Sequence, residues 1–165
     1  MTFYKATTPD GKDFRTGTLD YAGALVSGEP VSRPDQGPMV KDSPSTYLSV
    51  SVEPGEVLLG GTWPCRLFLV EPLGEVIGSD DHPYKRCCKS LRVLEEVPAH
   101  QALGPNGAEV AAIIERIDGL TVGEIRHRGA AWGAARDAAL ATLTQDLMSP
   151  DQHTLLMGPW NAVIS

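Results

Sequence analysis

The chain has 165 residues, of which 42% are hydrophobic and 21% charged, and its formal net charge at pH 7 is −7. This length and apolar share suffice for one ordinary hydrophobic core, which excludes a wholly disordered chain. The negative charge disfavours a protein that binds nucleic acid mainly through its phosphates, so nucleic acid is not an expected partner.

No stretch approaches the ~20 consecutive apolar residues of a membrane helix, and the first residues lack the apolar segment of a signal peptide. We therefore expect a cytoplasmic protein with no membrane contact. Its three cysteines, Cys65, Cys87 and Cys88, are too few for a disulfide framework and are expected to be reduced. Metal-ligand spacings, phosphate-binding loops and nucleophile motifs are missing, so the sequence predicts no metal site and no cofactor.

Residues 1–107 have the composition of short strands separated by turns. Apolar runs and period-two alternation predict strands over 2–7, 47–52, 65–71 with an extension over 74–77, and 90–97. A short helix is expected over 19–27, with Gly28 as its C-terminal stop. Residues 28–45 are rich in proline and poor in large apolar side chains, which predicts a surface loop.

Residues 108–165 are typical of helices. Apolar residues of helical period predict a first helix over 108–117, marked by Val110, Ile113, Ile114 and Ile117. A capping box formed by Thr121 and Glu124 predicts that a second, long helix follows, from about 122 to 148. Its later part should present a narrow face of small residues and leucines, comprising Ala131, Ala135, Ala138 or Ala139, Leu143 and Leu147.

A third helix is expected to begin at Ser149-Pro150 and to end at Gly158-Pro159, followed by an apolar tail that docks. Strands first and helices afterwards predict an α+β fold. We expect a small, mostly antiparallel sheet within 1–107, packed by the helices of 108–165 in the same domain.

The main basic concentration of the sequence comes just before and within the last predicted strand. Its cations are candidates for gripping phosphate groups of a ligand, and they are Lys85, Arg86, Lys89 and Arg92. The plainer interpretation is a solvated approach to a strand, balanced by Asp80 and Asp81. These cations are also expected to lower the pKa of the Cys87 or Cys88 thiol.

Two further patterns in the strands bear on function. The alternation places Glu95 on one face with Leu91, Val93 and Val97, where a carboxylate is either paired or has a raised pKa; alternatively, it lies at a frayed strand end. Three hydroxyl side chains share a face of the strand over 47–52. These residues, Tyr47, Ser49 and Ser51, either line a pocket or face water, and we expect water.

Several phrases of the chain resemble an uncharacterised family of actinobacteria and their bacteriophages. They include Tyr4-Lys5-Ala6-Thr7, Tyr47-Leu48-Ser49-Val50-Ser51, Trp63-Pro64-Cys65-Arg66-Leu67-Phe68, Ala102-Leu103-Gly104-Pro105 and Gly158-Pro159-Trp160. The resemblance covers most of the chain. It implies an accessory protein that acts in the cytoplasm of an infected bacterium.

The order of strands is also similar to the mono-ADP-ribosyltransferase fold. In that family an Arg or His on the first strand, a Ser-Thr-Ser strand and a late Glu bind NAD and assist transfer. The matching positions are Lys5, Ser49 with Ser51, and the pair Glu95 and Glu96. Lysine replaces the Arg or His, and Val50 replaces the middle threonine, which puts catalysis in doubt more than fold.

Two functions follow as expectations. The first is a small non-catalytic phage accessory protein that binds a bacterial host or phage protein, with self-association through the alanine face as a variant. The second is an ADP-ribosyltransferase-like nucleotide-binding protein or degenerate enzyme that takes NAD. In the second case Glu95 and Glu96 are the catalytic candidates, and the ligand-binding candidates are Lys5, Tyr47, Ser49, Ser51, Lys85, Arg86, Lys89 and Arg92.

Overall fold

The computed structural model of the chain describes residues 1–34, 37–40, 43–78, 82–118 and 131–164. They form two compact units, Met1–Ala102 and Leu103–Ser165. The first contains the sheet and the second is helical, so the predicted α+β class is confirmed. The division falls close to the change in composition at 107/108. Packing of the helices on the sheet within one domain stays a prediction.

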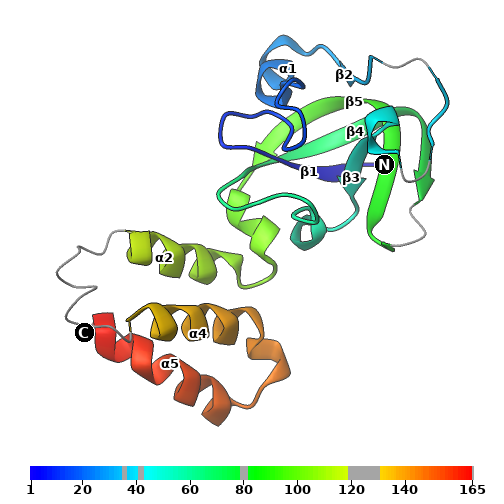
Figure 1. Ribbon diagram of the computed structural model, residues 1–165. Coiled ribbons are helices and arrows are strands. Elements are labelled where there is room, and N and C mark those ends of the chain that lie inside the picture. The colour runs from blue at the N-terminus through cyan, green and yellow to red at the C-terminus, as the bar shows by residue number, and fades with distance from the viewer. Residues whose placement is uncertain (35–36, 41–42, 79–81, 119–130, 165) are drawn as a thin grey trace. The chain divides into compact units, whose positions relative to one another are not determined.

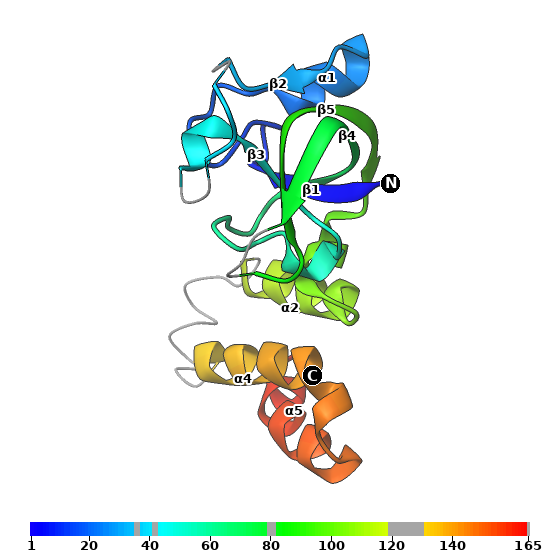
Figure 2. The ribbon, with the colours of Figure 1, turned by 90° about the vertical axis from the view of Figure 1, so that its right-hand side faces the viewer.

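Five antiparallel strands form the sheet: β1 (Phe3–Thr7), β2 (Val31–Ser32), β3 (Leu48–Ser51), β4 (Arg66–Gly78) and β5 (Lys85–Val97). Their order is β2-β5-β3-β1-β4, and β4 also pairs with β5. The pairings of β5, β3, β1 and β4 therefore close into a ring. Figures 1 and 2 show β4 and β5 as two long, curved strands.

The two long strands extend beyond the predicted segments. The predicted strand over 65–71 and its extension form one continuous β4, and β5 begins at Lys85 instead of at residue 90. The partner strand explains the difference, because Cys87 and Cys88 of β5 pair with Ile77 and Val76 of β4. The basic residues before position 90 thus belong to the sheet.

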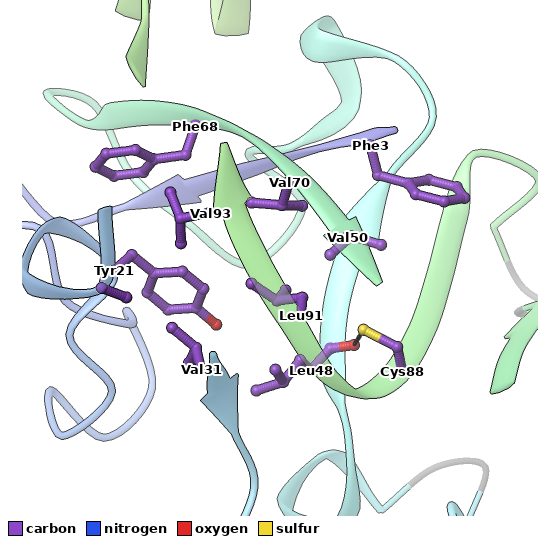
Figure 3. Packing of buried hydrophobic residues seen from close by; sticks show 11 residues of the cluster. Phe3, Tyr21, Val31, Leu48, Val50, Phe68, Val70, Cys88, Leu91 and Val93 are labelled. Atoms are coloured by element: carbon purple, nitrogen blue, oxygen red, sulfur yellow. Dashed lines mark hydrogen bonds between the residues drawn. The ribbon is translucent and has the colours of Figure 1, made fainter. Parts of the chain in front are cut away.

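One face of the sheet carries the main apolar cluster, to which α1 (Tyr21–Ser27) contributes Tyr21 and Ala24. Figure 3 shows Tyr21 among the side chains of the strands, including Phe68, Leu91 and Val93. The prediction for α1 is confirmed. Asp20 caps its first turn by accepting a hydrogen bond from the Gly23 N–H at 2.8 Å, and Gly28 ends the helix with a φ of 73°.

A second cluster covers the opposite side of β4 and is built from Ala6, Cys65, Leu67 and Ala102. Leu67 and Phe68 are neighbours in sequence, lie in different clusters and are both fully buried. This agrees with the sequence pattern, because a nearly continuous apolar run is typical of a strand covered on both faces.

The predicted loop at 28–45 contains the short strand β2 and the first residues of a 3₁₀ turn, η1 (Pro44–Thr46). Residues 35–36 and 41–42 of that segment lie outside the described residues. Further 3₁₀ turns are η2 (Pro54–Glu56) and η3 (Ala99–Leu103) in or bordering the first unit, and η4 (Gln145–Leu147) in the second.

The second unit contains α2 (Gly107–Asp118), α4 (Ala131–Leu143) and α5 (Pro150–Ile164), and α4 contacts both other helices (Figure 1). Its core is made largely of alanines, with Ile113 from α2 and Trp160 from α5 as the large members. The predicted first helix is confirmed, and its Val110 and Ile113 are buried. The described helices of the chain include none that is both long and apolar enough to cross a membrane.

The predicted long helix ends earlier than expected. The capping box at Thr121 and Glu124 lies outside the described residues, and α4 stops at Leu143. Near this end the side chain of Asn106 donates a hydrogen bond to the Thr142 carbonyl at 2.9 Å, satisfying an oxygen that a continuing helix would have bonded. Leu143 and Leu147 are exposed and do not join Ala135 and Ala138 in the core of this unit.

The predicted end of the last helix at Gly158-Pro159 is also wrong, because α5 continues through Pro159 to Ile164. Its start is as expected, with Ser149 and Gln152 exchanging side chain to backbone hydrogen bonds. Gly158 has no Cβ to clash with the following proline ring, and buried Trp160 holds the next turn in the core.

Candidate functional site

A cavity of about 390 Å³ lies in the first unit, between the strands and the segments that precede and follow them. Its wall combines aromatic, hydroxyl and charged side chains. The residues that line it are Tyr4, Lys5, Ala6, Asp13, Phe14, Arg15, Tyr21, Arg33, Pro44, Tyr47, Leu48, Ser49, Val50, Ser51, Glu56, Val57, Leu59, Gly60, Gly61 and Lys85. Five of the sequence candidates are among them, namely Lys5, Tyr47, Ser49, Ser51 and Lys85.

The cavity arises where β1 and β3 stop pairing. These strands meet at one register position, Tyr4 opposite Ser51, and β1 continues along β4 alone. Beyond that position the Ser49 carbonyl accepts its hydrogen bond from the Lys5 ammonium, with an N–O distance of 3.0 Å. A lysine side chain thus takes the place of a backbone donor, and the space between the strands becomes the cavity.

Lys5 is the most perturbed cation of the site. Burial lowers its pKa to about 8, against an ordinary value of 10.5, and the charges of Arg33 and Lys85 act in the same direction. Asp13 and Cys88 act in the opposite direction and hold the pKa up. The ammonium also lies 5.4 Å from the centroid of the Tyr21 ring, a cation–π distance. The side chain is therefore largely charged at pH 7 and loses its proton within a unit or so above it.

Tyr21 carries a buried hydroxyl without a hydrogen-bond partner among the described residues. The residue is fully buried, and burial raises its pKa well above the ordinary value. Buried hydroxyl groups are normally bonded, because an unbonded one loses its hydration without compensation. The ring lies within the main apolar cluster, among the side chains that Figure 3 shows around it.

Cations outnumber carboxylates in the wall. Lys5, Arg15, Arg33 and Lys85 face two acidic residues, Asp13 and Glu56. Burial alone would raise the pKa of Asp13, but N–H donors from its own loop outweigh it and keep the pKa below the ordinary value. Those donors include the amides of Thr16 and Leu19, at 2.8 and 2.9 Å from its carboxylate oxygens. Asp13 is ionised and already bonded, which leaves the cations to act on a ligand.

The hydroxyl face of β3 lines the cavity, which corrects the expectation that it faces water. Tyr47 and Ser51 are 5% and 4% exposed, and the ammonium of Lys85 lies 5.6 Å from the Tyr47 ring centroid. Arg33 completes this side, because its Nε donates to the Tyr47 carbonyl at 3.1 Å.

The basic segment divides among different surroundings. Lys85 pairs with Ser51 and lines the cavity, whereas Arg86 donates to the carbonyls of Pro83 and Lys85. Lys89 lines a second hollow with Arg33 and Glu75, and Arg92 lies 3.8 Å from Glu71. These four residues do not form one phosphate grip, because alternate strand residues point to opposite faces.

Glu95 and Glu96 do not line the cavity, and both are exposed. The register of β4 and β5 shifts between Leu69 and Val70, so that Glu95 pairs with Leu69 while Val93 pairs with Val70. The extra residue moves Glu95 off the face of Leu91 and Val93, which corrects the predicted alternation. Glu96 forms a bidentate ion pair with Arg66, with N–O distances of 2.8 and 2.6 Å.

The three thiols are buried and are not activated. Burial raises the pKa of Cys87, although Lys85 and Lys5 oppose it, and raises the pKa of Cys88 to about 12. The prediction that basic neighbours lower these pKa values is therefore wrong, because desolvation outweighs the charges. Cys88 lies in the main apolar cluster and donates weakly to the Leu48 carbonyl, as the dashed line in Figure 3 marks.

Sequence reasoning missed several polar residues of the wall, among them Asp13, Arg15, Tyr21 and Arg33. Asp13 carried a weak signal, since an Asp near Thr and Gly residues is typical of a turn that its side chain organises. Tyr21 reads as an ordinary core residue of an amphipathic helix. Arg33 lies in the proline-rich segment, where no local pattern marks it.

The described residues contain no group of three or more His, Cys, Asp or Glu side chains that could hold a metal ion. No protein-family model matches the chain, and neither the curated proteins nor the solved structures include a match to it. Function is therefore inferred from the residues of the cavity.

Proposed function

We propose that the chain is a non-catalytic binding protein for a small organic anion, which it holds in the cavity between β1 and β3. One observation carries this proposal: Lys5 of β1, Ser49 and Ser51 of β3 with the preceding Tyr47, and Lys85 of β5 line the same cavity. A buried charge such as the Lys5 ammonium is costly, so it favours a site in which a ligand compensates it.

The charge of the wall supports an anionic ligand. Lys5, Arg33 and Lys85 are close enough that the latter two lower the pKa of Lys5, in a chain whose net charge is −7. An anion among them would relieve their mutual repulsion. It would also accept hydrogen bonds from the Lys5 ammonium, which uses one donor on the Ser49 carbonyl.

The size and the aromatic side chains support an organic ligand of modest size. A volume of about 390 Å³ is near the lower end of ligand pockets, which favours a single small metabolite over a dinucleotide. Tyr4 and Phe14 in the wall are partly exposed and offer ring surfaces that inorganic phosphate would leave uncovered.

Binding is favoured over group transfer by the position of the carboxylates. Under the ADP-ribosyltransferase resemblance, Lys5, Ser49 and Ser51 would bind NAD and a late glutamate would assist the transfer. Glu95 and Glu96 lie elsewhere, and Glu96 is engaged by Arg66. NAD is one of the anions that the proposal includes, and its binding would use the same cations.

Thermal melting tests the proposal with a panel of acetate, benzoate, inorganic phosphate, AMP and NAD. A ligand that binds only the native state adds ~2.7 kcal/mol at about 100 times its Kd, an easily measured rise in Tm. We expect a rise with an organic anion that Lys85→Ala and Lys5→Met reduce. Lys12→Ala is the matched control, because Lys12 carries the same charge and does not line the cavity.

A panel without any shift, or shifts that Lys12→Ala reduces as much as Lys85→Ala, would contradict the proposal. NAD and AMP acting alone would favour the nucleotide-binding form of it. Benzoate or acetate acting without them would favour a carboxylate ligand.

Binding of a host or phage protein is the second candidate function, and exposed leucines of the helical unit favour it. Leu140, Leu147 and Leu155 are 53%, 87% and 76% exposed. The alanine face of α4 is covered inside the unit, so self-association would need these leucines instead. Sedimentation of the wild type and of Leu147→Glu with Leu155→Glu tests self-association. A complex with bacterial or phage protein that the same substitutions disrupt would favour a partner protein.

A further inference from the structure

The Lys5 amine lies where a bound molecule could react with it. It is held in the wall of the cavity by the Ser49 carbonyl at 3.0 Å and faces the Tyr21 ring at 5.4 Å. Lys12, by comparison, lies on the surface beside Asp10, at 3.6 Å. Lys85 also lines the cavity, and Lys5 differs from it in having its amine fixed by a hydrogen bond to a backbone carbonyl.

We propose that Lys5 forms a reversible imine with a small oxo acid, a molecule that carries an aldehyde or ketone carbonyl beside a carboxylate. This inference rests on the proposed anion binding and names the substrate class of the same cavity. The carboxylate would be attracted by Arg33 and Lys85, which would bring the neighbouring carbonyl carbon toward the amine.

The amine is available as a nucleophile near neutral pH. The groups that face it are Asp13 and Tyr21 before β2, Arg33 after β2, and Lys85 and Cys88 on β5. With burial, they leave its pKa at about 8. At pH 7 the uncharged fraction is then about 300 times that of an ordinary lysine. Desolvation is a known means of activating lysines for imine formation.

The step balances without an oxidant or a reductant. The lone pair of the uncharged Lys5 amine attacks the carbonyl carbon, and one amine proton passes to the carbonyl oxygen to give a carbinolamine. Loss of water breaks the C–O bond and forms the C=N bond. The released water contains the carbonyl oxygen and both protons of the amine, so the step needs no further proton source.

Reductive trapping tests this inference on the full chain. We would mix the protein with glyoxylate and cyanoborohydride, which reduces imines to stable amines, and map the labelled peptides by mass spectrometry. We expect Lys5 to be labelled roughly tenfold or more faster than Lys12 and Lys85, with a rate that rises along an apparent pKa near 8. Fragmentation of the labelled peptide must assign the label to the Lys5 amine and not to the α-amino group, because α-amino groups ordinarily have a pKa of about 8.

Variants and unfolded chain show whether the fast labelling of Lys5 depends on the folded cavity or only on the exposure of its amine. Lys5→Arg keeps the charge and removes the nucleophile, so it should abolish the fast label. Chain unfolded in urea should label Lys5 no faster than Lys12. Because Lys5→Arg could disturb the fold, Lys5→Met serves as the second variant, with circular dichroism of both as the check.

The two proposals fail in different ways. Glycolate has the carboxylate and lacks the carbonyl, so it should raise the Tm without any label. If glycolate or benzoate raises the Tm while glyoxylate labels Lys5 no faster than Lys12, imine formation is overturned and anion binding stands. If no anion raises the Tm and no fast label forms, both are overturned.

Discussion

The hydrophobic cores of the two units are built from side chains of different size. The sheet unit fills its main cluster with large side chains such as Phe68, Leu91 and Tyr21. The helical unit packs alanines closely, with Ala135 and Ala138 fully buried, and Ile113 and Trp160 are the large members of its core. Apolar area buried scales with side-chain size, so the helical unit has the smaller reserve of stability.

This difference bears on where function is placed. A unit with a well-filled core can tolerate a buried ammonium and an unbonded hydroxyl at Lys5 and Tyr21. Each such feature costs stability and is found where a ligand compensates it. The helical unit carries no comparable buried charge among its described residues. The contrast leads to predictions in which each unit fails separately.

The largest expected effect comes from Trp160→Ala. Removing a buried aromatic side chain costs about 3–5 kcal/mol, which is most of the stability of a unit of this size. We expect the helical signal in circular dichroism to fall, while melting of the sheet unit and the ligand-dependent rise in Tm persist. Phe68→Ala is the matched variant in the other unit and should abolish ligand binding instead.

If Trp160→Ala and Phe68→Ala each abolished one cooperative unfolding transition of the whole chain, the two units would not unfold separately. That result would mean that the two units share their stability. The prediction of one domain, made from the sequence, would then gain support.

Lys5→Met comes next and should stabilise the protein. The lowered pKa of Lys5 corresponds to a cost of about 3 kcal/mol for holding the ammonium in the fold at pH 7. Methionine keeps the apolar stem, although it leaves the Ser49 carbonyl without its bond, a loss of about 1 kcal/mol. Denaturant unfolding at pH 7 should therefore give a gain of about 1–2 kcal/mol, together with lost anion binding. Destabilisation at pH 7 would contradict the assignment of a strained charge.

The same group predicts a pH dependence. Between about pH 8 and 10.5 the native state has released the Lys5 proton and the unfolded chain still binds it. The contribution of Lys5 to the free energy of unfolding therefore rises with pH between those two values. The Lys5→Met variant lacks this rise. The advantage of the variant at pH 7 should shrink by pH 10, as measured by the difference between two unfolding curves.

Local patterns were enough to predict most elements of the sheet unit. The caps of α1 and the double burial of β4 follow from residues within a few positions of each other. The site candidates Lys5, Ser49 and Ser51 were also chosen from the sequence. The ADP-ribosyltransferase resemblance grouped them at one ligand, whereas the strand pattern alone favoured hydroxyls that face water. Whether two strands stay paired or diverge depends on tertiary contacts, which local periodicity does not contain.

The predictions from sequence that were wrong also failed because tertiary contacts outweighed local patterns. A one-residue shift of register moved Glu95 to a different face, and such a shift depends on the partner strand. Pro159 predicted a helix end, but packing of Trp160 outweighed the lost backbone bond. Arg33 reaches the Tyr47 carbonyl across 14 positions of the sequence, at 3.1 Å, from a segment with no periodic pattern.

A smaller effect is expected from the ion pair of Arg66 and Glu96. Both side chains are substantially exposed, at 32% and 40%, so the bidentate pair should contribute at most about 1 kcal/mol. The hydrogen bonds from Arg66 hold the pKa of Glu96 below its ordinary value. This contribution is therefore present at neutral pH and is lost as acid protonates Glu96. Glu96→Gln should lower stability slightly at pH 7 and leave ligand binding unchanged, whereas an effect on binding would restore Glu96 as a site residue.

The smallest effect on stability, and the clearest on chemistry, concerns the thiols. Burial raises the pKa of Cys65, Cys87 and Cys88, and the thiolate is the reactive form. Native protein at pH 7.5 should react slowly with an aromatic disulfide reagent at all three positions, and chain unfolded in urea should react at once. Ligand that occupies the cavity should not change the slow rate, since none of the three thiols lines it. Fast reaction at Cys87 in the native state would mean that β5 opens near Lys85, and the wall of the cavity would then be a moving part of the sheet.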